Sequence, residues 1–220
     1  MNFPAELIPG ALQWPLALSY LALLALTARY APWGALTVAA QRNVWLGATV
    51  TMLVLWQVKA GIRPGLDLHL LGASALTLVS GPALALLGLT IALVASTLID
   101  GATLTNFAFG GWLLVALPIG LTYLFVMLCH RYLPQHIFIY LFVAVFLATA
   151  VSMALTALTI SGLLAASGVY PPSHLSREYL PYFLLLSWPE ALLTGMALTL
   201  MVVFRPHWVA TYYEDRLARR

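Results

Sequence analysis

Charged side chains are scarce in this sequence, since aspartate, glutamate, lysine and arginine together make up 8% of its 220 residues. A soluble domain carries roughly 25% charged residues, because its surface must be hydrated. Hydrophobic residues instead make up 62% of the chain. Such a chain cannot cover a surface that faces water, so the composition excludes a soluble domain and predicts an integral membrane protein.

The sequence also lacks the motifs of several function classes. The single cysteine, Cys129, lies in an apolar run, which excludes disulfide frameworks and thiolate metal clusters. No Walker A loop, HExxH or GxSxG motif is present, so we expect no ATP hydrolysis by this chain, no catalytic residues and no enzyme. The first residues have no basic region and include the acidic Glu6, so we expect the N-terminus to be retained.

Seven apolar segments predict an all-α bundle of about six to seven transmembrane helices in one polytopic domain, residues 1–220. A transmembrane helix needs about 20 apolar residues. Proline lacks a backbone donor, so Ser80-Gly81-Pro82 predicts a hairpin that leaves only a partial or tilted span before it. The segments cover residues 12–28, 43–60, 69–80, 82–98, 111–129, 136–160 and 181–204.

Basic residues predict an N-terminus outside and a C-terminus in the cytoplasm, with 205–220 as a basic cytoplasmic tail. In this topology the cytoplasmic side holds Arg29, Arg42, Arg131, Arg205, Arg216, Arg219 and Arg220, and the outer side holds only Lys59, Arg63 and Arg177. The polar residues expected on the outer side, where a solute would arrive, are Asp67, His69, Asp100, Asn106 and His174.

Three polar residues near or inside the apolar segments allow more than one interpretation. Glu190, after Pro189, is the clear intramembrane acid. It suits a helix-start carboxylate or a packing role against another span, with a proton relay as the alternative. Asp67 suits the N-cap of a helix that begins at His69 better than a direct ligand, and a second-shell role is compatible with capping. His69 alone would be read as a cap or interfacial residue.

Several short motifs follow one another along the chain: His69-Leu70-Leu71-Gly72-Ala73, Asp100-Gly101, Asn106 with Gly111, and Glu190 followed by Thr194-Gly195. Their order and spacing resemble the substrate-binding membrane subunits of energy-coupling-factor transporters for cobalt and nickel, the CbiM/NikM family. The resemblance covers most of the chain.

The resemblance implies a metal site built on the N-terminus, with residues 1–11 inserted into the protein. In the family, the α-amine, the nitrogen and imidazole of a second-position histidine, and the loop histidine form a planar four-nitrogen site, a geometry that suits Ni(II). Here Met1 and His69 match two of these positions, with Asp67 as a further oxygen, and Asp100 and Asn106 as supports. The metal would be cargo, not a permanent cofactor.

The family also implies partners and a location. Transport would need a transmembrane coupling subunit and cytoplasmic ATPases, in a bacterial inner membrane; we expect no nucleic acid partner. Two residues depart from the family pattern: Asn2 replaces the second-position histidine and Phe109 stands where a second asparagine is usual. An amide oxygen is a weak ligand for late transition metals. A family relative that has lost its metal site and acts as a scaffold or assembly partner is therefore the alternative.

Overall fold

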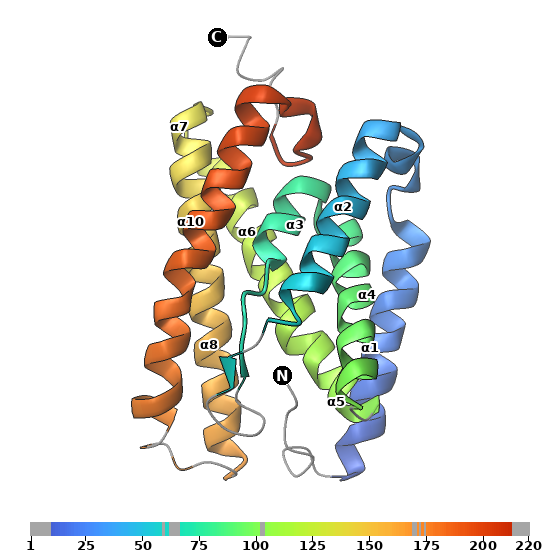
Figure 1. Ribbon diagram of the computed structural model, residues 1–220, viewed down its shortest axis with the longest axis vertical. Helices are drawn as coiled ribbons and strands as arrows, with labels where there is room; N and C mark the ends of the chain where they lie inside the picture. Colours follow the sequence, from blue (N-terminus) through green and yellow to red (C-terminus); the bar gives the residue numbers. More distant parts are fainter. Residues whose placement is uncertain are drawn as a thin grey trace.

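The computed structural model describes residues 10–58, 60–61, 67–101, 104–168, 171, 173 and 175–212 as a helical bundle along one long axis (Figure 1). Its first half comprises α1 (Gly10–Tyr30), η2 (Trp33–Thr37), α2 (Ala39–Leu55), β1 (Ala60–Gly61), β2 (Asp67–Leu68), α3 (Ala73–Ser80) and α4 (Pro82–Asp100). Its second half comprises α5 (Leu104–Gly110), η3 (Gly111–Ala116), α6 (Leu117–Tyr132), α7 (Ile137–Ile139), η4 (Tyr140–Leu147), α8 (Ala148–Ala166), η5 (Leu175–Tyr179), α10 (Leu180–Phe204) and η6 (Pro206–Trp208).

Four helical stretches in the described part of the chain are long and apolar enough to cross a membrane: Pro82–Ile99, Asn106–Tyr132, Ile137–Ala166 and Leu175–Phe204. They cover the last four segments predicted from the sequence, except for residue 136. The third extends beyond the predicted segment because α8 continues to Ala166, and the fourth because the π-helical turn η5 precedes α10. Helices α1 and α2 cover the first two predicted segments, although α2 ends at Leu55 and not at residue 60. The all-α membrane fold is thus confirmed.

The short helix α3 lies inside the bundle and does not cross it. Its eight residues span about 12 Å, much less than the roughly 30 Å of a bilayer's hydrocarbon core. The antiparallel pair β1–β2 precedes it, and the chain then re-enters the bundle, where α3 packs against α2, α4, α6, α8 and α10 (Figure 1). The hairpin predicted at Ser80-Gly81-Pro82 is confirmed, because Gly81 has a φ of 80° and Pro82 begins α4.

Two hydrophobic clusters meet at α3. Leu76 joins the larger one, which includes Trp56, Met52 and Phe183. Leu78 and Val79 join the second, which includes Tyr140 and Val202. In lipid, close packing replaces the hydrophobic effect as the force between helices. Because α3 contributes to both clusters, its position is fixed by most of the bundle.

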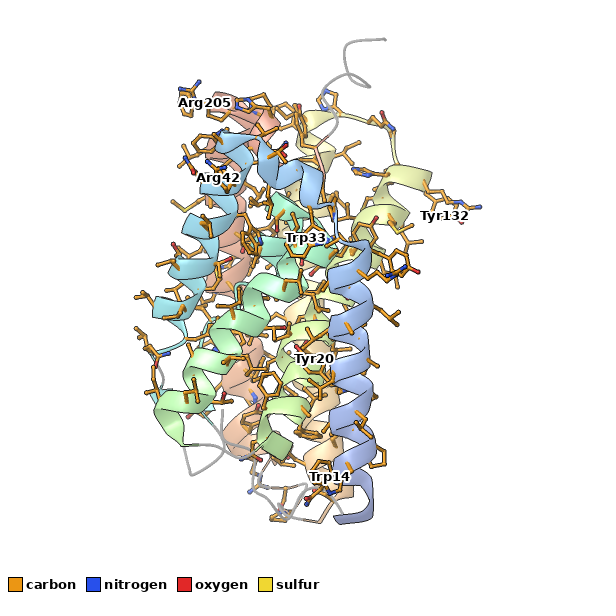
Figure 2. The ribbon with its side chains drawn as sticks, turned by 90° about the vertical axis from the view of Figure 1, so that its right-hand side faces the viewer. Trp14, Tyr20, Trp33, Arg42, Tyr132 and Arg205 are labelled. Atoms are coloured by element: carbon orange, nitrogen blue, oxygen red, sulfur yellow. The ribbon has the colours of Figure 1, made fainter. Side chains whose placement is uncertain are left out.

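The two ends of the bundle differ in composition. Arg42, Arg205 and Tyr132 lie at one end, and Trp14 lies at the other (Figure 2). Arg29 and Arg131 are in the last turns of α1 and α6, and so belong to the arginine-rich end. Arg177, in η5, precedes α10 and therefore lies toward the opposite end from Arg205.

Candidate functional site

His69 occupies the connection between β2 and α3, and its side chain is buried at 5% exposure. Its ring centroid lies 5.1 Å from that of Trp56, with the two rings tilted by 47°. Its Nδ1 lies 3.1 Å from the Leu70 carbonyl oxygen. In the tautomer protonated at Nδ1, this N–H donates to the Leu70 carbonyl oxygen, and Nε2 is the ring nitrogen that carries the acceptor lone pair.

The segment that follows His69 is held by Trp56, which comes directly after α2. The indole Nε1–H of Trp56 donates to the Leu71 carbonyl oxygen at 2.9 Å, and the side chain is almost fully buried. Trp56 thus contacts the His69 ring and binds the backbone two residues further on. The sequence placed Trp56 inside the second predicted segment but gave no signal for this contact.

Glu190, in α10 (Leu180–Phe204), binds the same segment. The backbone N–H groups of Leu71 and Gly72 donate to its Oε2 and Oε1, each at 2.9 Å. The first N–H groups of a helix have no partner within the helix, and the positive end of the helix dipole favours a negative charge. Glu190 therefore caps the amino end of α3 by accepting hydrogen bonds from the N-cap residue Gly72 and from Leu71 before it.

Gly72, the N-cap residue of α3, is required at its position for two reasons. Its φ of 64° lies in the left-handed region, which residues with a Cβ rarely adopt. A Cβ there would also overlap the Sδ atom of Met52. The start of α3 is thus packed closely against α2.

These contacts correct two predictions. Helix α3 begins at Ala73 and not at His69, and Gly72 occupies its N-cap position, so Asp67 does not stand directly before the helix. Asp67 lies in β2 instead. A capping or second-shell role for Asp67 stays a prediction. Glu190 does not start its own helix either, because α10 runs from Leu180 through Pro189 and beyond. It caps a different helix, which combines the two structural roles proposed for it.

The other candidate residues are placed less closely or lie outside the described residues. Met1, Asn2 and His174 are outside them. Asp100 is the last residue of α4, and Asn106 is half-buried in α5. Among the described residues, no three His, Cys, Asp or Glu side chains gather in a group that could hold a metal ion.

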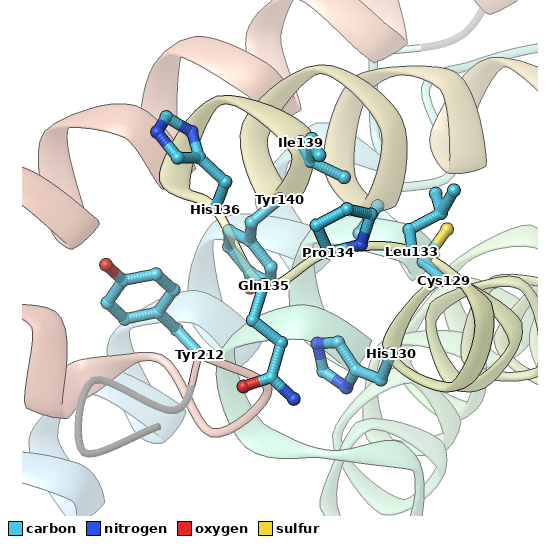
Figure 3. A pocket seen from close by; sticks show the side chains of 10 residues that line it. Cys129, His130, Leu133, Pro134, Gln135, His136, Ile139, Tyr140 and Tyr212 are labelled. Atoms are coloured by element: carbon cyan, nitrogen blue, oxygen red, sulfur yellow. The ribbon is translucent and has the colours of Figure 1, made fainter. Parts of the chain in front are cut away.

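A separate pocket lies at the end of the bundle where α6 ends and η4 begins. It encloses about 30 Å³, and its walls include Cys129, His130, Gln135, His136 and Tyr212. Figure 3 shows the rings of His130 and His136 on different sides of the pocket, and they do not converge on one point. His136 is exposed and His130 is half-buried. The two histidines therefore lie at the rim of this pocket.

Comparisons with known proteins address the identity of the fold. A family model described as the cobalt uptake substrate-specific transmembrane region, CbiM, matches residues 2–208. A solved structure described as a truncated transition metal transporter superposes with a TM-score of 0.73 at 15% sequence identity, over 92% of this chain and 99% of that one. At this identity the likeness shows a shared fold. No curated protein sequence matches the chain.

The family model includes the His69 segment, its Glu190 cap and every described helix, so the chain belongs to the CbiM family of cobalt uptake substrate-specific transmembrane regions.

Proposed function

We propose that this protein is the substrate-binding membrane component of an energy-coupling-factor importer for a divalent transition-metal ion such as cobalt or nickel. It would capture the ion on the outer side of a bacterial inner membrane and release it with the help of a separate coupling subunit and ATPases. Family membership supports a role in metal uptake, and the related solved structure is described as a transition metal transporter.

The observation that carries this proposal is a buried histidine on an immobilised backbone. His69 is 5% exposed, and the residues after it are bonded by Trp56 and Glu190. A ligand held by its surroundings loses little freedom when it binds a metal. A histidine that served only at an interface would have no need of these buried restraints.

The proposed ligand set combines His69 with the α-amine of Met1 and the side chain of Asn2. Asp67 would act as a second-shell group or a further oxygen ligand, and Asp100 and Asn106 would support the loops around the site. With an amide at position 2, the set has fewer nitrogens than the family's planar arrangement, so we expect weaker binding of Ni(II) and Co(II) than a histidine there would give.

Asn2 also favours a second function, in which the protein has lost its metal site and scaffolds another membrane complex. Isolation in mild detergent distinguishes the two. Co-purification of ATPase and coupling subunits supports transport, and stable association with an unrelated membrane enzyme supports the scaffold.

Metal binding is tested by calorimetry on the purified protein with Ni, Co, Zn and Cu ions. We expect at least one ion to bind to the wild type and the His69→Ala variant to bind it at least tenfold more weakly. His207→Ala is the matched control, since His207 is exposed in η6 beyond α10 and should leave the affinity unchanged. If no ion binds, or if both histidine variants behave alike, the metal-site proposal fails.

A further inference from the structure

The carboxyl end of α3 is capped by residues 210 and 211, which follow α10 and η6 in the chain. The backbone N–H of Ala210 donates to the Val79 carbonyl at 2.9 Å, and that of Thr211 donates to the Leu78 carbonyl at 3.2 Å. The Thr211 hydroxyl donates to the same Leu78 oxygen at 2.8 Å. The last carbonyls of a helix have no partner within the helix, and here residues 210 and 211 supply one.

Tyr140 fixes Thr211 in this position. Its hydroxyl lies 2.8 Å from the Thr211 Oγ1 atom. Because the Thr211 hydroxyl donates its proton to Leu78, Tyr140 is the donor in this second bond. Both side chains are buried, so water does not compete for these bonds. Tyr140, Thr211 and Leu78 form a chain of hydrogen bonds that joins η4 to the end of α3.

A single stretch of chain therefore holds both ends of α3. Glu190 binds the amino end, next to His69, and residues 210–211 bind the carboxyl end. Between them α10 runs beside α3, and the chain turns at η6 to come back (Figure 1). We call residues 190–211 the brace of α3.

We infer that Thr211 and Tyr140 are positioning residues for His69, which act through α3 from the opposite end of that helix. Because the amino end of α3 is bonded to Glu190 and the carboxyl end to Thr211, loosening the carboxyl end lets α3 move against Glu190. The His69 segment, whose backbone is bonded to the same carboxylate, moves with it. The role of His69 as a metal ligand rests on the proposed function; the mechanical link does not.

The hydrogen-bonded chain can be reached from the arginine-rich end of the protein. Tyr140 and its neighbour Tyr212, whose ring centroids are 5.0 Å apart, both line the pocket of Figure 3. A change at this surface therefore has a route of direct contacts to the buried His69 segment, through Tyr140, Thr211 and α3.

The link is tested by hydrogen exchange on the full-length protein, at the amides of Leu71 and Gly72. Thr211→Val keeps the shape of the side chain and removes both of its hydrogen bonds. We expect exchange at these two amides to accelerate roughly tenfold, the effect of losing a buried hydrogen bond. Glu190→Gln is the positive control, because it removes an acceptor from these amides directly. Thr199→Val is the matched negative control, since the Thr199 hydroxyl bonds only Gly195 of its own helix.

Tyr140→Phe removes a single oxygen atom and serves in place of Thr211→Val if that variant does not fold. Faster exchange confined to residues 78–79 and 209–212, with Leu71 and Gly72 unchanged, would overturn the inference. In a wild type that binds nickel or cobalt, the same variants should speed release of the ion by a similar factor, and unchanged release would also count against it. If the wild type binds no ion, the proposed function fails, but exchange at Leu71 and Gly72 still decides whether the brace positions α3.

Discussion

At the scale of single residues, the His69 segment depends on groups that are remote in sequence. Glu190 binds the amide of Gly72 across 118 positions of the chain, and Trp56 binds the carbonyl of Leu71 across 15. The sequence predicted a helix-start carboxylate or a packing role for Glu190, with a proton relay as the alternative. It did not predict which amides Glu190 binds, because that depends on how α10 packs against α3.

The Trp56 contact leads to a prediction with a matched control. Trp56→Phe keeps an aromatic ring against His69 but leaves the buried Leu71 carbonyl without the indole donor, so we expect a loss of about 1–3 kcal/mol in the free energy of unfolding. Trp33→Phe removes a similar bond, from Nε1 to the Ala28 carbonyl, but Trp33 is 48% exposed and water replaces the donor. Thermal unfolding in detergent should therefore show a clear decrease for Trp56→Phe and little change for Trp33→Phe. Equal effects would mean that burial of the bond has no importance.

At the scale of elements, the sequence predicted the hairpin between α3 and α4 correctly but not the residue at which α3 begins. The hairpin at residues 80–82 was predictable because proline and glycine act on the backbone locally. The start of α3 was not, since Gly72 takes its left-handed conformation where the helix is capped by α10 and packed against α2. The ligand role of His69 stays a prediction, and its partners Met1 and Asn2 lie outside the described residues.

The close packing of α2 against the start of α3 is tested by a pair of substitutions. Gly72→Ala places a methyl group on Met52 and forces an alanine into a positive φ, so we expect it to destabilise the protein by about 2–4 kcal/mol. Met52→Ala in the same chain removes the overlap but not the backbone strain. The double variant should thus be more stable than the sum of the two single effects by about 1–3 kcal/mol.

Chemical or thermal unfolding measures this difference, and Gly120→Ala is its control. Gly120 lies in α6 with no atom within 4 Å of an added Cβ, so alanine there should stabilise the helix by about 0.5–1 kcal/mol. Strictly additive effects of Gly72→Ala and Met52→Ala would contradict the predicted clash.

At the scale of the whole molecule, α3 packs against five other helices of the bundle, and the described arginines lie mostly at one end of it. Helices α1, α6 and α10 run in the same direction and end at the same end of the bundle (Figure 1). Four described arginines gather there, and Arg177 precedes α10 at the other end. Cytoplasmic segments of membrane proteins carry an excess of arginine and lysine. We therefore expect the arginine-rich end to face the cytoplasm and the β1–β2 pair to lie on the outer side of the membrane.

This orientation is tested by introducing one cysteine at each end of the protein. Ser176 and His207 are exposed residues that lie before and after α10. The native Cys129 is buried and is the single cysteine of the sequence, so replacing it with alanine gives a background without thiols. In intact cells, a membrane-impermeant maleimide should label Ser176→Cys and leave His207→Cys unlabelled until the cells are permeabilised. Labelling in the reverse order would mean that the β1–β2 end of the protein, from which the chain leads to His69, faces the cytoplasm. The protein could then not capture an ion from outside through the β1–α3 segment, and the import proposal would fail even if the ion bound to His69.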